Sequence, residues 1–306
     1  MIAPAADSPR PSPDGSLIDA TIDQPARSLW SDAWGQFRAN KLAMIGMAFL
    51  LLVTIVAIFA DLIAPYGITE RDSSNFRAGP SSAHLFGTDT IGLDLFSLIV
   101  HGSRVSLRIG VGATVLSLAV GLFVGAVSGY FGGWLDSLMM RITDIFLAVP
   151  YIVLAIAVAT VFGKSENSVI LVLGLTGWLA IARIVRSSFL QLKQLEYVEA
   201  ARAMGFSRWR IMFRHILPNA LQPIIVYGTI SIGSAILAES ALSFLGVGPQ
   251  FPTPAWGRLI AENKGALASA PHLVIFPGLA ISLTVLSFVL VGDGLRDALD
   301  PKLRER

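Results

Sequence analysis

Five carboxylates lie within or beside the long apolar runs of this sequence, where an ionisable group often marks a path for protons or ions. They are Asp61, Asp136, Asp144, Glu239 and Asp293. Most of them lie near the ends of the runs, and Asp144 follows Arg141 by three residues, a spacing that predicts a local ion pair on one helix face. Glu239, followed by Ser240, lies further inside a run. We weigh two roles for Glu239 and Ser240: a pathway or gate, or a hydrogen-bonded structural contact.

The other polar residues do not form the pattern of a catalytic or metal site. The sequence has no cysteine, and its four histidines lack the spacing of metal ligands. Gly110-Val111-Gly112 lacks the third glycine of a dinucleotide-binding loop, and no phosphate-binding loop that ends in Lys-Ser or Lys-Thr is present. We therefore expect no catalytic residue, no metal and no cofactor bound by this chain.

The composition is that of a protein with several membrane spans. Apolar residues make up 54% of the 306 residues and charged residues only 14%, compared with about a quarter in soluble domains. The mean hydropathy is +0.66. The net charge of +2 does not indicate nucleic-acid binding, because no basic stripe is interleaved with aromatic residues.

Six apolar runs are long enough to cross about 30 Å of hydrocarbon at about 1.5 Å per helical residue. We expect them at about 42–64, 105–131, 135–162, 168–188, 217–243 and 272–293. They belong to one membrane domain at 29–306, preceded by a proline-rich tail, residues 1–28, that is predicted to be disordered. No series of carboxylates crosses these runs, which argues against a proton-coupled carrier.

The positions of the basic residues predict the orientation. If the N-terminus is inside, sixteen of the 23 lysines and arginines lie on inner segments and seven on outer ones. This bias places both termini and the 189–216 loop in the cytoplasm. Residues 65–104 and 244–271 are then external loops, and we expect short helices in the first.

The inner loop at 189–216 has the composition of a short helix pair. Residues 194–204 favour a helix, and Gly205 is suited to end it. Ser207 is a candidate N-cap for a second short helix that runs toward Phe213, before Pro218 begins the next span.

This helix pair is suited to bind another protein. Ala200, Ala201 and Ala203 would form a small-residue face that fits a groove, with Glu199 and Arg202 making charged contacts. The alternative is an amphipathic elbow that packs on lipid.

Small residues recur at every fourth position of the second run. They are Ala113, Ser117, Gly121, Gly125, Gly129 and Gly133. Such a face lets a neighbouring helix backbone approach closely. The seam at Gly121, Gly125 and Gly129 would pack either within this chain or against a second membrane subunit.

At the inner loop, the chain resembles the permease subunits of bacterial ATP-binding-cassette (ABC) importers. That family carries Glu-Ala-Ala, a glycine and a final Leu-Pro, which here are Glu199-Ala200-Ala201, Gly205 and Leu217-Pro218. His215 replaces the isoleucine of the general pattern, but Arg214 to Asn219 looks like the dipeptide and oligopeptide branch.

Four other stretches are similar to that branch: His84–Asp89, Glu239–Gly246, Pro254–Gly257 and Gly292–Pro301. The chain departs from the branch at Leu93, where arginine is usual, and at Val289, where asparagine is frequent.

The resemblance implies an all-α membrane protein with a type I ABC importer permease fold, six transmembrane helices and a cytoplasmic coupling helix that docks on an ATPase. The docking residues would be Glu199, Ala200, Ala201, Arg202, Met204, Gly205 and Phe206, and the end of the coupling loop would be His215, Leu217 and Pro218.

The resemblance also implies a complex in the bacterial inner membrane, with a second permease, two ATPase subunits and an external solute-binding protein. The ATPase subunits would bind ATP and magnesium. The chain looks like the second permease of the pair and would form half of a path for dipeptides or oligopeptides. Nickel or another small solute is the alternative cargo, and a standalone secondary carrier is the alternative class.

Overall fold

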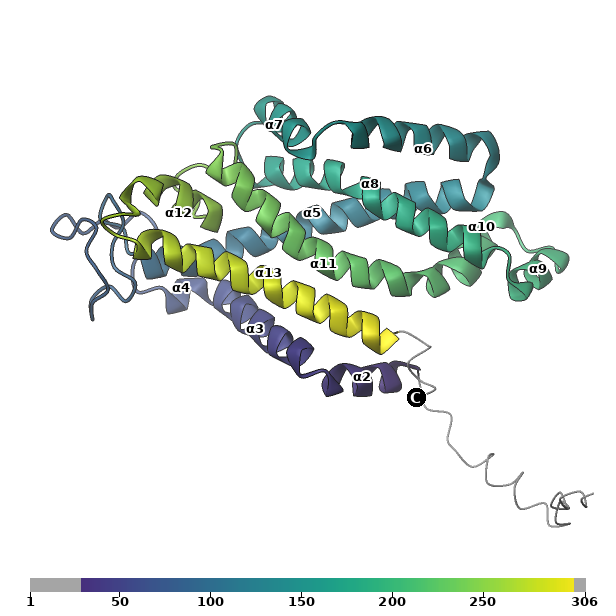
Figure 1. Ribbon diagram of the computed structural model, residues 1–306, viewed down its shortest axis with the longest axis horizontal. Coiled ribbons are helices and arrows are strands. Elements are labelled where there is room, and N and C mark those ends of the chain that lie inside the picture. The colour runs from purple at the N-terminus through teal and green to yellow at the C-terminus, as the bar shows by residue number, and fades with distance from the viewer. Residues whose placement is uncertain (1–28, 300–306) are drawn as a thin grey trace, which may run out of the picture.

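The computed structural model of the protein describes residues 29–299, and the regular elements in that range are helices that run side by side along the molecule (Figure 1). The predicted all-α class is confirmed. One end of the bundle carries the segment 64–94 and α12 (Trp256–Asn263), and the opposite end carries α9 (Glu196–Ala203). The tail predicted at 1–28 lies outside the described residues.

Five helices are long and apolar enough to cross a membrane. They are α3 (Lys41–Ile58), α5 (Leu95–Phe131), α8 (Glu166–Leu192), the continuous helix Arg208–Phe244, and α13 (His272–Leu299). Each matches one of the predicted runs. The chain is therefore a multi-pass membrane protein, and residues 29–299 contain five candidate spans, or six if the bent pair α6–α7 counts as one.

The run predicted as one span at 135–162 is broken. It forms α6 (Gly133–Ala148) and α7 (Tyr151–Phe162), which are bent by 93° where they meet. Val149 between them is extended, and Pro150 follows. Because a proline disfavours the helical conformation of the residue before it, the helix ends there. The predicted span is therefore present as a bent pair of helices, which counts as one span if the two cross the membrane together.

The loop that we expected at 65–104 is shorter than predicted. α5 begins at Leu95, well inside the expected loop at 65–104, because the Asp94 carboxylate accepts a hydrogen bond of 2.8 Å from the Ser97 N–H and caps the helix. After α2 (Leu29–Ala39) and α3, the one-turn helix α4 (Ala60–Ile63) ends the first span. Residues 64–94 then contain none of the short helices that we expected. The second loop contains α12 and a single 3₁₀ turn, Lys264–Ala266.

The glycine seam of α5 packs against α8 of the same chain. A Cβ at Gly121 would lie 2.7 Å from Ile181 Cβ, and one at Gly129 would lie 2.7 Å from Phe189 Cβ. A Cβ at Gly125 would overlap the Ala182 carbonyl oxygen. The two backbones thus touch along several turns, as small residues allow in membrane helices. Of the two alternatives for this seam, the structure shows packing within the chain.

Ion pairs hold α6 along α8. Asp136 receives hydrogen bonds of 2.6 and 2.7 Å from the Arg186 guanidinium, and Asp144 lies 2.5 Å from Arg183 Nη2. The predicted local pair of Asp144 with Arg141 was wrong, because the arginine of the neighbouring helix binds this carboxylate instead.

Candidate functional site

The segment 193–219, at the α9 end of the bundle, forms a corner of two helical arms. The first arm, α9, ends at Ala203, and Gly205 follows with a φ of +77°, a conformation that favours glycine. The Phe206 N–H then bonds to the Ala201 carbonyl at 3.2 Å, which completes a Schellman-type helix end. A short helix with a glycine corner is present where the sequence predicted it.

Two side chains of α9 attach it to the bundle. Val198 and Ala201 are buried and pack in one cluster with Phe189 of α8 and with Ile211 and Met212 of the second arm. Ala201 was predicted to face a partner, but it is only 1% exposed. It lies three residues after Val198, on the same face of α9, and packs against the bundle with it.

The other predicted docking residues point outward. Glu199, Ala200, Arg202 and Gly205 are exposed, and Met204 is 65% exposed. Together with the half-buried Phe206, these residues form a contiguous surface with both charges and apolar area. We call these six residues the docking surface.

Polar contacts connect the docking surface to the membrane helices. Arg202 Nη2 donates to the Lys193 carbonyl at 3.3 Å, and Lys193 Nζ donates to the Gly129 carbonyl of α5 at 2.8 Å. These two contacts link α9 to the end of α8 and to α5.

The second arm runs directly into the next span. The Ser207 hydroxyl caps it by accepting from the Arg210 N–H at 3.4 Å. The helix continues from α10 (Arg208–Arg210) through a π-helical stretch, Ile211–Ile216, into α11 (Leu217–Phe244). The predicted separate second helix was wrong: Pro218 has no N–H to donate, and the wider π turn before it lets the helix continue.

Aromatic contacts fix the inside of the corner. The Arg210 guanidinium lies 4.2 Å from the centre of the Phe206 ring, and the His215 ring stacks on the same ring at 5.6 Å. His215 is thus held inside the corner, whereas Leu217 and Pro218 form the first turn of α11 at its base.

A hollow of about 460 Å³ adjoins the docking surface. It is lined by Tyr130, Phe131, Arg202, Phe206, Arg208 and Ile211. Two arginines and three aromatic rings give it a cationic and apolar lining, which suits a protein side chain better than a metal ion. Sequence analysis did not predict this hollow, because Tyr130 and Phe131, at the end of α5, are far from the 189–216 loop in the sequence.

Glu239, the other candidate from the sequence, lies near the opposite end of the bundle and is fully buried. Its carboxylate accepts hydrogen bonds from Ser243 at 2.6 Å, from Ser240 at 3.4 Å and from Ser106 of α5 at 3.5 Å. Ser106 also accepts from the Trp256 N–H of α12 at 3.4 Å. These contacts join α5, α11 and α12, a geometry that favours the hydrogen-bonded structural role.

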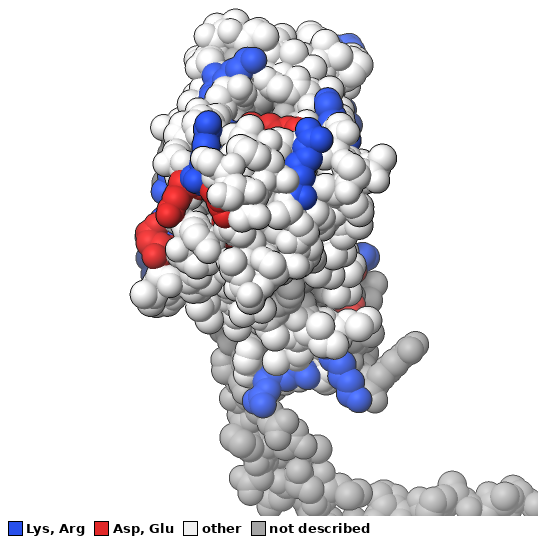
Figure 2. Space-filling view, turned by 90° about the vertical axis from the view of Figure 1, so that its left-hand side faces the viewer, with Lys and Arg blue, Asp and Glu red and all other residues white. Residues whose placement is uncertain are grey.

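A second polar cluster holds the segment 64–94. His84 is buried between Asp94, at 2.9 Å from Nδ1, and Asp72, at 3.3 Å from Nε2. Hydrogen bonds from Asn75 and Ser74 lower the pKa of Asp72 to about 2. Burial alone would lower the pKa of His84, but its bonds to the two aspartates outweigh that effect and raise it above 6.5. Figure 2 shows this end, where several basic side chains lie next to acidic ones and the rest of the described surface is largely uncharged.

Family models match most of the chain. Residues 121–305 match the binding-protein-dependent transport system inner membrane component, and residues 28–80 match the N-terminal transmembrane domain of oligopeptide transport permease C. The chain belongs to the family of binding-protein-dependent transport system inner membrane components, the permeases of ABC importers.

Curated relatives agree over nearly the whole length. The chain is 41% identical to the dipeptide transport system permease protein DppC of Alkalihalophilus pseudofirmus, over 99% of this chain and 97% of that one. It is 43% identical to the glutathione transport system permease protein GsiD of Pectobacterium atrosepticum, over 92% and 94%, and 45% identical to that of an Escherichia coli strain, over 91% and 92%.

The fold is similar to that of a solved permease. A chain from an inward-facing structure of the MetNI methionine ABC transporter superposes with a TM-score of 0.58, covering 67% of this chain and 98% of that one, at 21% identity. The structure thus has the type I ABC importer permease fold that we expected.

Proposed function

We propose that this chain forms half of the translocation path of an ATP-driven importer for dipeptides or oligopeptides, and that its docking surface couples the path to a cytoplasmic ATPase subunit. The observation that carries this proposal is the corner at α9. It projects from the bundle, leaves both charges and apolar side chains exposed, and is joined through Lys193 to Gly129 of α5. A closing ATPase can therefore move the membrane helices as rigid bodies.

The orientation follows from the same end of the molecule. α2 and the C-terminal end of α13 lie at the α9 end (Figure 1), so the described ends of the chain share one side of the membrane. The excess of basic residues on the predicted inner segments supports a cytoplasmic location for that side, in a bacterial inner membrane.

The partners are a second, homologous permease, two ATPase subunits and an external solute-binding protein. ATP and magnesium belong to the ATPase subunits, and this chain performs no bond chemistry. The names of the relatives, a dipeptide and a glutathione permease, support a peptide cargo. Nickel or another small solute is the alternative cargo, and a standalone secondary carrier is the alternative class.

Reconstitution in liposomes tests the proposal. The chain with its permease partner, the ATPase subunits and the binding protein should take up a radiolabelled dipeptide only when ATP is supplied. Liposomes that hold the chain alone, with a proton or sodium gradient, are the control. Uptake by the chain alone would contradict the coupling role, and a complex that moves nickel but no peptide would contradict the peptide class.

A further inference from the structure

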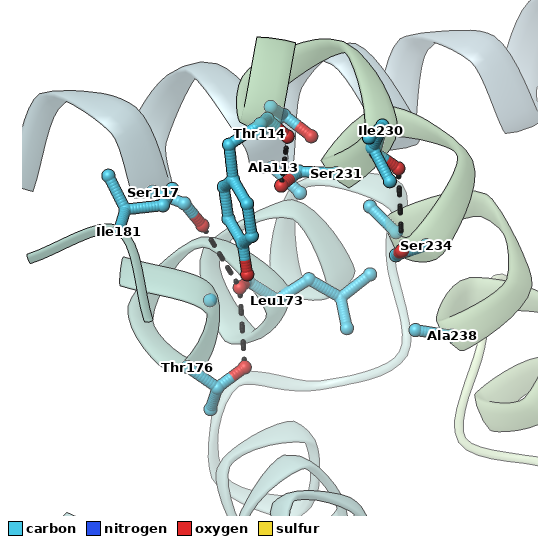
Figure 3. Close-up of a pocket in the computed structure, with 13 residues that line it drawn as sticks. Ala113, Thr114, Ser117, Leu173, Thr176, Ile181, Ile230, Ser231, Ser234 and Ala238 are labelled. Carbon is cyan, nitrogen blue, oxygen red and sulfur yellow. Dashed lines mark hydrogen bonds between the residues drawn. The ribbon is translucent and has the colours of Figure 1, made fainter. Parts of the chain in front are cut away.

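A cavity of about 240 Å³ with several hydroxyl groups in its lining lies between α5, α8 and α11 (Figure 3). Its hydroxyl groups come from Thr114 and Ser117 of α5, Thr176 of α8, and Tyr227, Ser231 and Ser234 of α11. No charged residue lines it. The lining is thus mainly apolar, with several hydroxyl groups and no charge.

One of these hydroxyls, that of Thr114, is buried without a hydrogen-bond partner among the described residues. Ser117, Thr176 and Ser231 donate to main-chain carbonyls at 3.0, 2.9 and 2.8 Å. Thr114 Oγ1 is buried without a hydrogen bond to any residue in the described range, although Thr114 is only 3% exposed. Because a buried hydroxyl without a partner is costly, the cavity is suited to hold a water molecule or a polar solute.

A second cavity, of about 450 Å³, adjoins the first toward the α9 end. It is lined by Ile184, Gln222, Pro223, Val226, Tyr227, Ile230, Asp293 and Arg296. Tyr227 and Ile230 line both cavities, so they lie between them. The two cavities follow one another along α11.

Asp293 and Arg296 are the charged residues of the second cavity. They are three residues apart on α13, so their Cβ atoms lie about 5–6 Å apart on one face. Both are exposed, and neither forms an ion pair with another residue between 29 and 299. Charges on a membrane helix avoid lipid and face protein or water. The face that carries both cavities is therefore directed away from lipid.

We propose that Asp293 and Arg296 bind a zwitterionic peptide at the inner end of the translocation path, after it has passed Tyr227 from the neutral cavity. Asp293 accepts the peptide ammonium group, and Arg296 binds the carboxylate, for which a guanidinium fork is suited. The uncharged hydroxyls contact the backbone and side chains without selecting a charge. This inference rests on the proposed peptide importer and names the residues of its path.

The absence of cysteine from this chain makes the first test direct. Single variants Ser231→Cys and Thr229→Cys are placed in the complete complex, and their reaction with a water-soluble methanethiosulfonate is followed by the mass of this chain. Thr229 lies on α11 but lines neither cavity. We expect Ser231→Cys to react about tenfold faster. Equal rates, or an unreactive Ser231→Cys, would overturn the aqueous path.

The second test measures binding. In nucleotide-free complex without binding protein, Ala-Ala should slow the modification of Ser231→Cys. Adding Asp293→Asn or Arg296→Gln should weaken this protection about tenfold, the effect of losing one charge-assisted hydrogen bond. Asp297→Asn, an exposed carboxylate outside the cavity, is the matched control.

Analogues identify which charge binds which end. N-acetyl-Ala-Ala has no ammonium group for Asp293 to bind, so Asp293→Asn should not weaken its protection further. Ala-Ala-amide has no carboxylate for Arg296 to bind, so Arg296→Gln should not weaken its protection further. Equal losses for every peptide, or no loss, would overturn the site. If the same complex takes up dipeptide with ATP and binding protein, such a result rejects only the exit site. If it does not, the proposed function itself fails.

Discussion

The two ends of the helical bundle treat their polar groups in opposite ways. At the α9 end, Glu199 and Arg208 are exposed and form no ion pair with any described residue, and Met204 and Trp209 are more than half exposed. At the other end, Glu239 and His84 are buried and bound by neighbours within the chain. The polar groups named at the α9 end are left exposed, whereas those named at the other end are bound within the chain.

This difference separates two kinds of substitution. Changes at the docking surface should leave the chain folded and impair what it does with partners. Changes at the Glu239 or His84 clusters should alter the stability or shape of the chain first. Four predictions test this separation, from the largest expected effect to the smallest.

Gly257→Val should prevent α12 from packing. A Cβ at Gly257 would overlap Ser240 Cα, which belongs to the backbone of α11 and cannot move aside. We expect loss of the folded chain, measured as the yield of monodisperse protein in detergent. Gly265→Val is the control, because a Cβ there would meet nothing within 4 Å. Normal yield of Gly257→Val would show that this end is not rigid.

Glu199→Arg and Gly205→Val should uncouple transport without unfolding the chain. The first reverses a charge on the docking surface, and the second places a side chain where φ is +77°. We expect ATP-dependent uptake to fall about tenfold, an effect of about 1.4 kcal/mol on coupling. Yield and melting temperature should stay near those of the unchanged protein for Glu199→Arg, whereas Gly205→Val should lower the melting temperature only by the local backbone strain. A large loss of stability instead would mean that this corner serves folding.

Glu239→Ala should destabilise the chain, because three serine hydroxyls lose an acceptor in a buried site. We expect a loss of about 2 kcal/mol, seen as a lower melting temperature of the purified complex. Glu239→Gln keeps an acceptor oxygen and should lose less. If Glu239→Gln melted normally but stopped uptake, the carboxylate would be a gate residue after all.

His84 should make the segment 64–94 sensitive to pH. Since the pKa of His84 is raised above 6.5 in the folded chain, its protonated form stabilises the segment at low pH, and this contribution is lost as pH rises through the folded pKa. Hydrogen exchange in this segment, corrected for intrinsic rates, should be about twofold faster at pH 8.5 than at pH 5.5. His84→Gln should remove the difference, and a difference that persists would exclude His84 as its cause.

The sequence predicted the local features well. Five apolar runs form long helices. Gly205 ends α9 with a positive φ, and this could be predicted because a positive φ depends mainly on the residue itself. The break at Pro150 was also readable, since a proline disfavours a helical residue before it, but the apolar composition on both sides led to one predicted span. Aspartate is a favoured N-cap residue, so the start of α5 after Asp94 could also have been predicted but was not.

Long-range contacts could not be predicted from one sequence. His84 and its aspartates are separated by ten and twelve residues, and Ser106 meets Glu239 across 133 residues. Ala201 was assigned to the wrong side of α9, because the burial of Val198 and Ala201 depends on Ile211 and Met212 in the second arm. The π-helical stretch before Pro218 has no sequence signal of its own.

The most direct test of the docking surface is site-specific cross-linking in the intact complex. Ala200 is exposed at the α9 end, and Leu85, which is 55% exposed, lies at the other end. Each is replaced by cysteine in turn. With a short heterobifunctional cross-linker, Ala200→Cys should join this chain to the ATPase subunit, and Leu85→Cys should not. A cross-link from Leu85→Cys to the ATPase, or one from Ala200→Cys to lipid only, would contradict the account.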